Sequence, residues 1–159
     1  MTRSICDLSD DHPQVVQTGE PLFRDFGQLK SFHGQISTIR CYEDNLLLRQ
    51  ILSTPGHGRV MVVGGGGSLR RALIGDRLGS LLIDNGWAGA IVYGAARDVE
   101  VLRTMPLAVR ALNICPTKPL QTGSGERDVI VTFAGVIFRP NEWLYADENG
   151  FIVSPTPLS

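Results

Sequence analysis

Residues 62–98 read VVGGGGSLRRALIGDRLGSLLIDNGWAGAIVYGAARD. A short apolar strand runs into four glycines, Gly75-Asp76 opens a helix, and a second apolar strand then leads to Arg97-Asp98. This order of strand, helix and strand predicts a parallel crossover, and such folds bind ligands at the carboxyl ends of their strands. We therefore expect an α/β fold whose functional site lies in this stretch.

The segments on either side extend the same pattern. β-branched residues with alternating polarity predict strands, and leucines at helical spacing predict helices. We expect strands at residues 32–42, 59–63, 87–93 and 107–114, helices at 45–52, 75–85 and 99–103, a capped turn at 68–72 and a loop at 94–98. Asp44 is the expected N-cap of the first of these helices. Short strands at 129–133, 136–138, 143–146 and 151–153 predict a C-terminal antiparallel meander on a mixed or layered sheet.

Length and composition indicate one soluble globular domain over residues 1–159. The chain is 43% hydrophobic and 19% charged, and its net charge of -1 favours no direct contact with DNA. No apolar run approaches the roughly 20 residues that cross a bilayer, so we expect no membrane contact and a cytoplasmic location. Cys6, Cys41 and Cys115 are odd in number and widely spaced, which predicts reduced thiols rather than disulfides or a zinc site.

The four glycines at residues 64–67 do not complete a nucleotide-binding motif. A P-loop needs a lysine after its glycines to reach the phosphates, and this chain continues with Ser68 and Leu69. A dinucleotide fingerprint needs a third glycine where this chain carries Leu69 or Arg70. We therefore interpret the glycines as a permissive loop that lets the following backbone approach a ligand.

Asp76, Arg97 and Asp98 form the stronger chemical signal. Arginine presents a planar fork of donors to a carboxylate or keto oxygen, and an aspartate at a strand end suits a hard divalent cation. Backbone N–H groups at the helix start after Gly75 suit a substrate carboxylate. Together these groups predict a small 2-oxo acid bound with magnesium or manganese. The alternative is that Asp76 only caps the helix and that Arg97 and Asp98 form a surface ion pair.

Other polar candidates are better explained by structure. Glu126-Arg127-Asp128 follows a glycine-rich polar stretch, which favours an exposed turn or a contact with a neighbouring subunit. The histidines sit singly, without the spacing of metal ligands, and we assign none of them to catalysis; they are His12, His33 and His57.

Several short motifs occur in order along the chain, and they cover nearly all of it. They are EPLF (residues 20–23), CYEDN (41–45), VVGGGGSLR (62–70), ALIGD (72–76), NGWAG (85–89), YGAARD (93–98) and WLYAD (143–147). Through these motifs the chain resembles the RraA-like family.

The resemblance implies a layered β/β/α sandwich, like that of the phosphohistidine swivelling domains. It also implies a ring-shaped homotrimer with sites between subunits, and it leaves open whether trimers pair into hexamers. The family holds metal-dependent aldolases of 4-hydroxy-4-methyl-2-oxoglutarate and 4-carboxy-4-hydroxy-2-oxoadipate that also decarboxylate oxaloacetate. It also holds regulators that bind and inhibit ribonuclease E and so modulate RNA decay.

Carried over by position, the resemblance implies a role for each residue of the central stretch. Gly75, Asp76, Arg77 and Leu78 would supply the loop and helix-start amides for the substrate. Arg97 would hold the keto oxygen and carboxylate, Asp98 would bind the metal, and Asp76 would order metal-bound water. We thus expect a lyase that acts through a metal-stabilised pyruvate enolate, with a ribonuclease regulator as the alternative.

Overall fold

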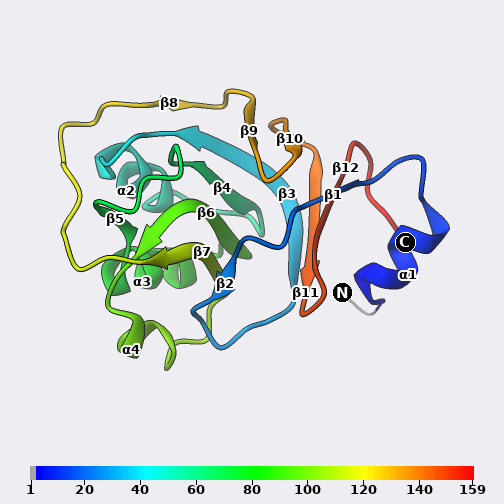
Figure 1. Cartoon of the computed structure of the whole chain (residues 1–159), viewed down its shortest axis with the longest axis horizontal. Coiled ribbons are helices and arrows are strands. Elements are labelled where there is room, and N and C mark those ends of the chain that lie inside the picture. The colour runs from blue at the N-terminus through cyan, green and yellow to red at the C-terminus, as the bar shows by residue number, and fades with distance from the viewer. Residues whose placement is uncertain (1–2) are drawn as a thin grey trace.

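In the computed structural model, which describes residues 3–159, strands from both ends of the chain surround a central crossover (Figure 1). The elements in chain order are α1 (Ile5–Asp11), β1 (Gln17–Thr18), β2 (Arg24–Asp25), β3 (Phe32–Arg40), α2 (Leu46–Leu52), β4 (Val60–Gly64), β5 (Ala72–Ile74), α3 (Asp76–Asp84), β6 (Gly89–Ala96), α4 (Val99–Leu102), β7 (Val109–Ile114), β8 (Glu126–Arg127), β9 (Val131–Phe133), β10 (Val136–Phe138), β11 (Trp143–Asp147) and β12 (Gly150–Ser154).

The predicted parallel crossover is confirmed. Strands β3, β4, β6 and β7 lie side by side and run parallel, with Val60 opposite Gly89 at the start of the β4–β6 pair. Antiparallel strands extend this core on both sides, giving the order β1-β12-β11-β3-β4-β6-β7-β2, while β5 pairs with β6 and β8 pairs with β3. The sheet is therefore mixed, as the sequence predicts.

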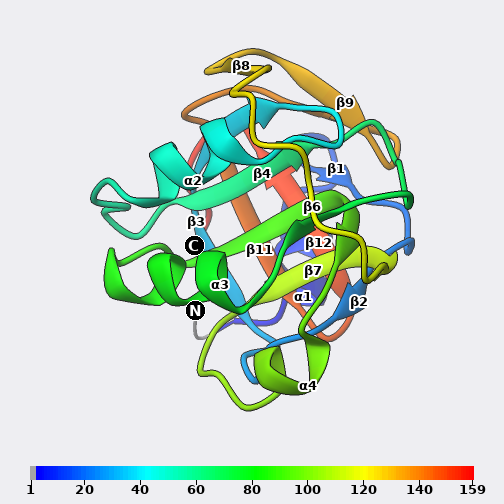
Figure 2. The same ribbon diagram turned by 90° about the vertical axis from the view of Figure 1, so that its left-hand side faces the viewer.

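Alternation along β4 explains the layers. Met61 and Val63 belong to a hydrophobic cluster under the helices, whereas Val60 and Val62 belong to a second cluster on the opposite face of the sheet. Successive side chains of a strand point to opposite faces, so this five-residue strand contributes to both cores and the sheet lies between them. Figure 2 looks onto the side that carries α2 and α3. The layered α/β architecture is confirmed.

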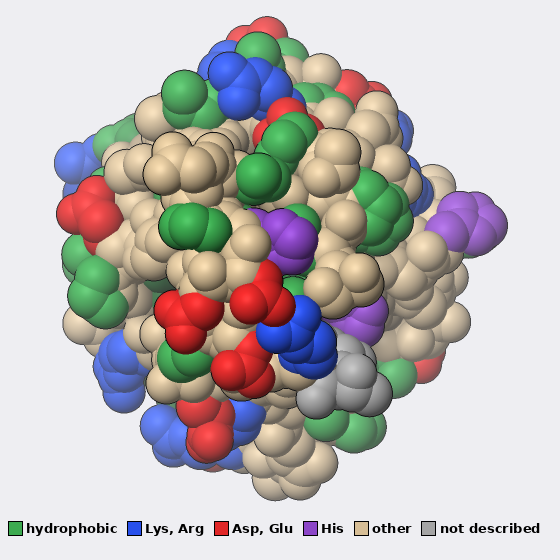
Figure 3. Space-filling view, turned by 90° about the vertical axis from the view of Figure 1, so that its right-hand side faces the viewer, with side chains coloured by type: hydrophobic (Ala, Val, Ile, Leu, Met, Phe, Trp, Pro, Cys, Tyr) green, Lys and Arg blue, Asp and Glu red, His purple; other side chains and the backbone are tan. Residues whose placement is uncertain are grey.

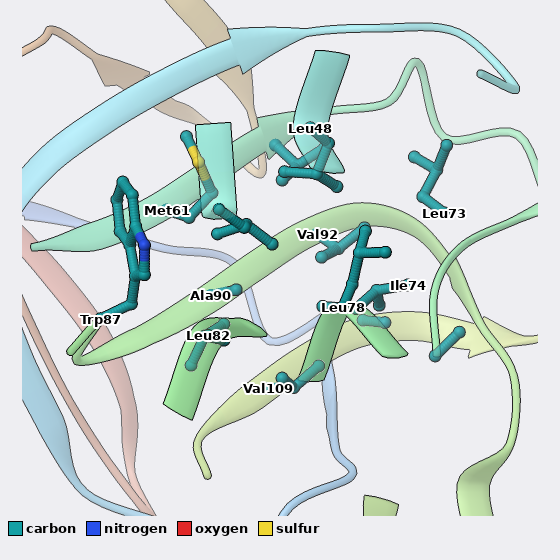
Figure 4. Packing of buried hydrophobic residues seen from close by; sticks show 14 of the residues in the cluster. Leu48, Met61, Leu73, Ile74, Leu78, Leu82, Trp87, Ala90, Val92 and Val109 are labelled. Atoms are coloured by element: carbon teal, nitrogen blue, oxygen red, sulfur yellow. The ribbon is translucent and has the colours of Figure 1, made fainter. Parts of the chain in front are cut away.

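The hydrophobic core on the helix side of the sheet holds α3, whose first turn carries predicted site residues. Leucines of α2 and α3, among them Leu48, Leu78 and Leu82, pack over Met61 and Ala90 of the sheet (Figure 4). Burying one such side chain contributes about 1.5–3 kcal/mol. This packing fixes α3, and with it the residues at its first turn.

The C-terminal strands pair antiparallel as expected, but they form two separate hairpins. Strand β9 pairs only with β10, while β11 and β12 join the large sheet through β3. The reason is burial, because Phe133 and Phe138 of the first hairpin pack against Phe151 in the second core cluster. Helix α1 covers the outer side of β11 and β12 through Ile5 and Leu8. Figure 3 shows this face, where acidic side chains gather.

Three local predictions need correction. Ala72 begins strand β5 instead of closing the turn expected at residues 68–72, and β6 continues to Ala96 where we expected a loop from residue 94. Each segment gains its strand hydrogen bonds from the other, because Ala72 pairs with Ala95 and Ile74 with Ala96. The N-cap of α2 is Asn45, one residue after the expected Asp44. Within residues 3–159, the helices are too short or too polar to cross a bilayer.

Candidate functional site

All six residues that the sequence singles out line one cavity of about 700 Å³. They are Gly75, Asp76, Arg77, Leu78, Arg97 and Asp98. The same cavity is lined by Asn45, the N-cap of α2, by Arg49 of α2, and by Pro119 and Gln121 from the segment between β7 and β8. That segment runs across the helix side of the molecule in Figure 2.

Paired strand ends bring the two halves of the site together. Strands β5 and β6 run parallel, and their last residues, Ile74 and Ala96, lie opposite each other. The N–H of Arg97 donates to the carbonyl oxygen of Ile74 at 2.9 Å. Gly75 and Arg97 therefore leave the sheet side by side at the carboxyl ends of parallel strands, where α/β folds bind ligands.

Gly75 makes room for the carboxylate of Asp98. Asp98 has φ +56°, in the left-handed region, and is the N-cap of α4. Its Oδ2 accepts a hydrogen bond from the N–H of Asp76 at 3.3 Å. A Cβ placed on Gly75 would lie 2.5 Å from the same Oδ2, a distance that real Cβ atoms do not show. A side chain at residue 75 is incompatible with this position of the carboxylate.

The first turn of α3 faces the cavity. Its N-cap is Gly75, which has no side chain to cap the helix, and the carboxylate of Asp98 accepts a hydrogen bond from the first N–H of the helix, that of Asp76. Asp76 therefore does not serve as a side-chain cap. The first N–H groups of a helix have no partner inside the helix, and the helix dipole adds positive potential at that end. This turn suits a bound carboxylate.

The charged side chains of the cavity are not paired with one another. None of the ion pairs found among residues 3–159 includes Arg49, Arg77, Arg97, Asp76 or Asp98. The guanidinium of Arg97 makes one long contact of 3.4 Å, with the carbonyl of Pro116. The surface ion pair considered from the sequence is thus not formed, and three guanidinium groups remain to attract an anionic ligand.

The lining residues fit a magnesium or manganese ion better than a metal held entirely by protein. Within residues 3–159, no group of three or more His, Cys, Asp or Glu side chains could hold a metal ion. Asp76 and Asp98 both line the cavity, and magnesium in proteins commonly uses one or two carboxylates and keeps several waters. Asp98, with its carboxylate held against the start of α3, is the better placed of the two.

Asp44 fastens the segment that carries Pro119 and Gln121. Its buried carboxylate accepts four hydrogen bonds, from the N–H groups of Leu46, Thr122 and Gly123 and from the Thr122 hydroxyl. Burial alone would raise the pKa of Asp44, but these donors outweigh it and hold the pKa below its usual range. Asp44 thus positions one wall of the cavity.

Glu43 fastens the glycine loop in a similar way. It has φ +57°, and its carboxylate accepts hydrogen bonds from the Ser68 hydroxyl at 2.5 Å and from Arg70 at 2.8 Å. The Ser68 hydroxyl, aided by Arg70, lowers the pKa of Glu43. The four glycines at residues 64–67 do not line the cavity, and a Cβ on Gly66 would meet the ring of Tyr42 at 2.7 Å. Their small size serves packing of the loop rather than ligand contact.

The remaining sequence candidates lie outside the cavity lining. Glu126 and Arg127 form β8 against β3, and Arg127 pairs with Asp128 at 3.3 Å in an exposed ion pair. His33 stacks on Tyr145, with ring centroids 5.7 Å apart, and burial lowers its pKa. Neither group lines the cavity. Glu126 and Arg127, which we expected in an exposed turn, form a strand instead because β3 supplies their pairing.

Sequence reasoning missed the residues that reach the cavity from other segments. Asn45, Arg49 and Gln121 all line the cavity, yet only Asn45 belongs to one of the short motifs, CYEDN at residues 41–45. Arg49 reads as an ordinary polar position of a short helix, and Gln121 as part of a polar loop. Nothing in the local pattern of either residue signals a shared cavity.

Comparisons with known proteins agree with this architecture. A family model described as RraA-like, Aldolase/RraA, matches residues 2–153. A relative from Xanthomonas campestris pv. campestris (strain 8004) is 52% identical, covering 100% of this chain and 95% of the relative, and it bears a provisional name as a 4-hydroxy-4-methyl-2-oxoglutarate aldolase.

Two solved structures are similar over nearly their whole length. The RNA-processing inhibitor RraA from Thermus thermophilis is 42% identical with a TM-score of 0.96, covering 100% of this chain and 96% of that chain. A protein from Geobacillus kaustophilus HTA426, described as S-adenosylmethionine:2-dimethylmenaquinone methyltransferase, is 39% identical with a TM-score of 0.95, covering 98% and 96%. These names differ in activity, so the chemistry of the cavity has to carry the functional argument.

Proposed function

The chain belongs to the RraA-like family, and on that premise we propose that it is a lyase of small 2-oxo acids. The proposed reactions are aldol cleavage of 4-hydroxy-4-methyl-2-oxoglutarate and decarboxylation of oxaloacetate. The observation that carries the proposal is the convergence of Gly75, Arg97 and Asp98 on one cavity that holds unpaired guanidinium groups. The name of the 52% identical relative supports 4-hydroxy-4-methyl-2-oxoglutarate as the substrate.

The substrate is held at its oxo-acid end. Its C1 carboxylate lies at the first turn of α3, where the N–H groups and the helix dipole favour an anion. The guanidinium of Arg97 donates to the 2-oxo oxygen. Asp98, with Asp76 beside it, would hold a magnesium or manganese ion, which supplies further positive charge at this end of the substrate.

Both reactions break the C3–C4 bond and leave its electron pair on C3, as the enolate of pyruvate. In aldol cleavage the 4-hydroxyl loses its proton and C4 becomes a carbonyl carbon; in decarboxylation C4 leaves as carbon dioxide. Arg97 stabilises the negative charge that develops on the 2-oxo oxygen, and such fixed charges are typically the largest catalytic contribution. Protonation at C3 then yields pyruvate.

Cleavage alone requires a base for the 4-hydroxyl proton. The cavity contains no histidine, and its carboxylates are Asp76 and Asp98. We assign the proton to a water molecule positioned by Asp76, since a carboxylate can orient water toward a substrate hydroxyl. Decarboxylation has no such requirement.

The test measures pyruvate release with coupled lactate dehydrogenase, for both substrates, with added magnesium and with EDTA. Arg97→Ala and Asp98→Ala should each lower kcat/KM by about 10²-fold or more. Matched controls are Arg103→Ala and Asp84→Ala, which remove exposed side chains of the same types outside the cavity lining. Full activity of Asp98→Ala would rule out its metal role, and wild-type protein inert on both substrates would rule out the lyase.

A second candidate function is supported by the likeness to the RNA-processing inhibitor from Thermus thermophilis. We propose as the alternative that the chain binds ribonuclease E through its outer surface. A pull-down with purified ribonuclease E, repeated with Asp98→Ala, separates the two functions. Tight binding that is indifferent to this substitution, without turnover of either oxo acid, would favour the regulator.

A further inference from the structure

Asn45 carries an unused hydrogen-bond acceptor in the wall of the cavity. Among the described residues, two buried side-chain polar atoms have no hydrogen-bond partner, Nε2 of His12 and Oδ1 of Asn45. Of these two residues only Asn45 lines the cavity, and Asn45 is 6% exposed. A buried polar atom without a partner destabilises the folded state, so it calls for an explanation.

The orientation of the Asn45 amide follows from its other end. Its Nδ2 donates to the carbonyl oxygen of Leu73 at 3.0 Å. Turning the amide over would set Oδ1 against that carbonyl, bringing two acceptors together with no proton between them. The backbone N–H of Asn45 is likewise fixed, because it donates to the carbonyl of Leu120 at 3.1 Å. Oδ1 is therefore a positioned acceptor.

Asn45 lines the same cavity as the residues assigned to the oxo-acid end of the substrate. Leu73, to which it is bonded, lies on β5 two residues before Gly75, and two residues of strand span about 7 Å at most. Gly75 in turn lies so near the carboxylate of Asp98 that an added Cβ would come within 2.5 Å of its Oδ2. The amide thus shares the cavity with the groups that hold the oxo-acid end, and Leu73 links it to them along the chain.

We propose that Oδ1 of Asn45 accepts a hydrogen bond from the 4-hydroxyl of the substrate, which makes Asn45 a specificity-determining residue for 4-hydroxy-2-oxo acids. This inference rests on the proposed lyase function. Oδ1 is covered by its neighbours and Asn45 borders the cavity, so we place the donor for Oδ1 on the cavity side. The neutral amide positions the 4-hydroxyl as the substrate binds and takes no proton. The O–H bond then turns from Oδ1 to the water positioned by Asp76, which accepts the proton as C4 becomes a carbonyl carbon.

Oxaloacetate lacks the group that Asn45 requires. Its C4 is a carboxylate, which offers only acceptor oxygens at neutral pH. Oδ1 therefore meets another acceptor when oxaloacetate binds, and it has a donor when a 4-hydroxy acid binds. A site built to pair with a substrate hydroxyl discriminates strongly against ligands without one. Asn45 should favour cleavage over decarboxylation.

The test compares both reactions in Asn45→Ala and Asn45→Asp. In Asn45→Ala, kcat/KM for aldol cleavage should fall about 10- to 100-fold, while that for oxaloacetate decarboxylation stays within about threefold or rises. Asn45→Asp keeps an acceptor oxygen and loses the donor to Leu73, so the ratio of the two activities should stay closer to the wild-type ratio. Equal losses of both activities in Asn45→Ala would overturn the inference and leave Asn45 a structural residue.

A measurement on the wild-type protein serves if Asn45→Ala does not fold. We expect 4-hydroxy-2-oxoglutarate to compete with oxaloacetate at least about tenfold more tightly than 2-oxoglutarate, which has no 4-hydroxyl. Equal competition by the two acids would contradict the inference. Wild-type protein that turns over neither substrate refutes the lyase itself, so the two failures are distinguishable.

Discussion

Replacing Gly75 with alanine places a methyl group against the carboxylate of Asp98. The added Cβ would lie 2.5 Å from Oδ2, whereas ordinary contact begins at 3.4 Å, so the carboxylate must withdraw by the difference of about 0.9 Å. The backbone itself accepts alanine, because Gly75 has φ -145°, in the extended region. The substitution thus acts on the position of Asp98 and leaves the fold intact.

The expected loss is large in activity and small in stability. A misplacement of about 1 Å in a catalytic site can cost on the order of 10²-fold, so kcat/KM for pyruvate release should fall about 100-fold with both substrates. Alanine is a poorer N-cap than glycine, which costs on the order of 1 kcal/mol and lowers Tm by about 2–4 °C. The assays are the coupled pyruvate assay and thermal unfolding followed by circular dichroism.

Gly58→Ala is the matched control, since it should lower stability and leave activity unchanged, whereas Gly75→Ala should mainly lower activity. Gly58 has φ +73° and nothing within 4 Å of an added Cβ, and it lies in the turn before β4, away from the cavity. The left-handed backbone should cost alanine about 1–2 kcal/mol of stability, without loss of activity in the folded fraction. Gly75→Ala with kcat/KM within threefold of wild type would refute the contact between Gly75 and Asp98 as a requirement of the site.

Two further predictions follow from groups whose pKa is shifted. Asp44→Asn should lower the free energy of unfolding by about 2–3 kcal/mol at pH 7, measured by urea unfolding, because it removes an acceptor from several buried donors. Since the folded pKa of Asp44 is depressed, its contribution to stability is present above about pH 4 and is lost as pH falls through the folded value. The difference in free energy of unfolding between wild type and Asp44→Asn should therefore be smaller at pH 3 than at pH 7. An unchanged difference would contradict this account. Burial raises the pKa of Cys41 to about 12, so iodoacetamide at pH 8 should label exposed Cys6 and spare Cys41 until the protein is unfolded, as mass spectrometry of peptides would show; equal labelling rates would refute this.

Local patterns predicted most of the regular structure. The start of α3 at Asp76 and its end before Gly86 follow from glycine and helical spacing, and both are confirmed. The three-residue strand β5 was missed because so short a segment carries no period of its own. It exists because the edge of β6 supplies its hydrogen bonds. The extra length of β6 was missed for the same reason.

The residues that line the cavity differ in how far the sequence predicts their placement there. Gly75 to Leu78 and Arg97-Asp98 stand at the start of the predicted helix and after the strand that follows it, which placed both in one crossover, and they line one cavity. The pairing of β5 with β6, which the sequence did not predict, brings them side by side. The catalytic roles given to them stay predictions. No comparable rule brings the α2 residues or Gln121 to the same place.

The sequence by itself determined the crossover and which of its ends gathers polar groups, because alternation, helical spacing and glycine positions are properties of short segments. Only the tertiary structure decided that Asp44 fastens the segment at Thr122 and that Asn45 presents Oδ1 beside Leu73. These contacts join segments far apart in the chain. They depend on strand register and on the packing of α2 over the sheet, which no local propensity encodes.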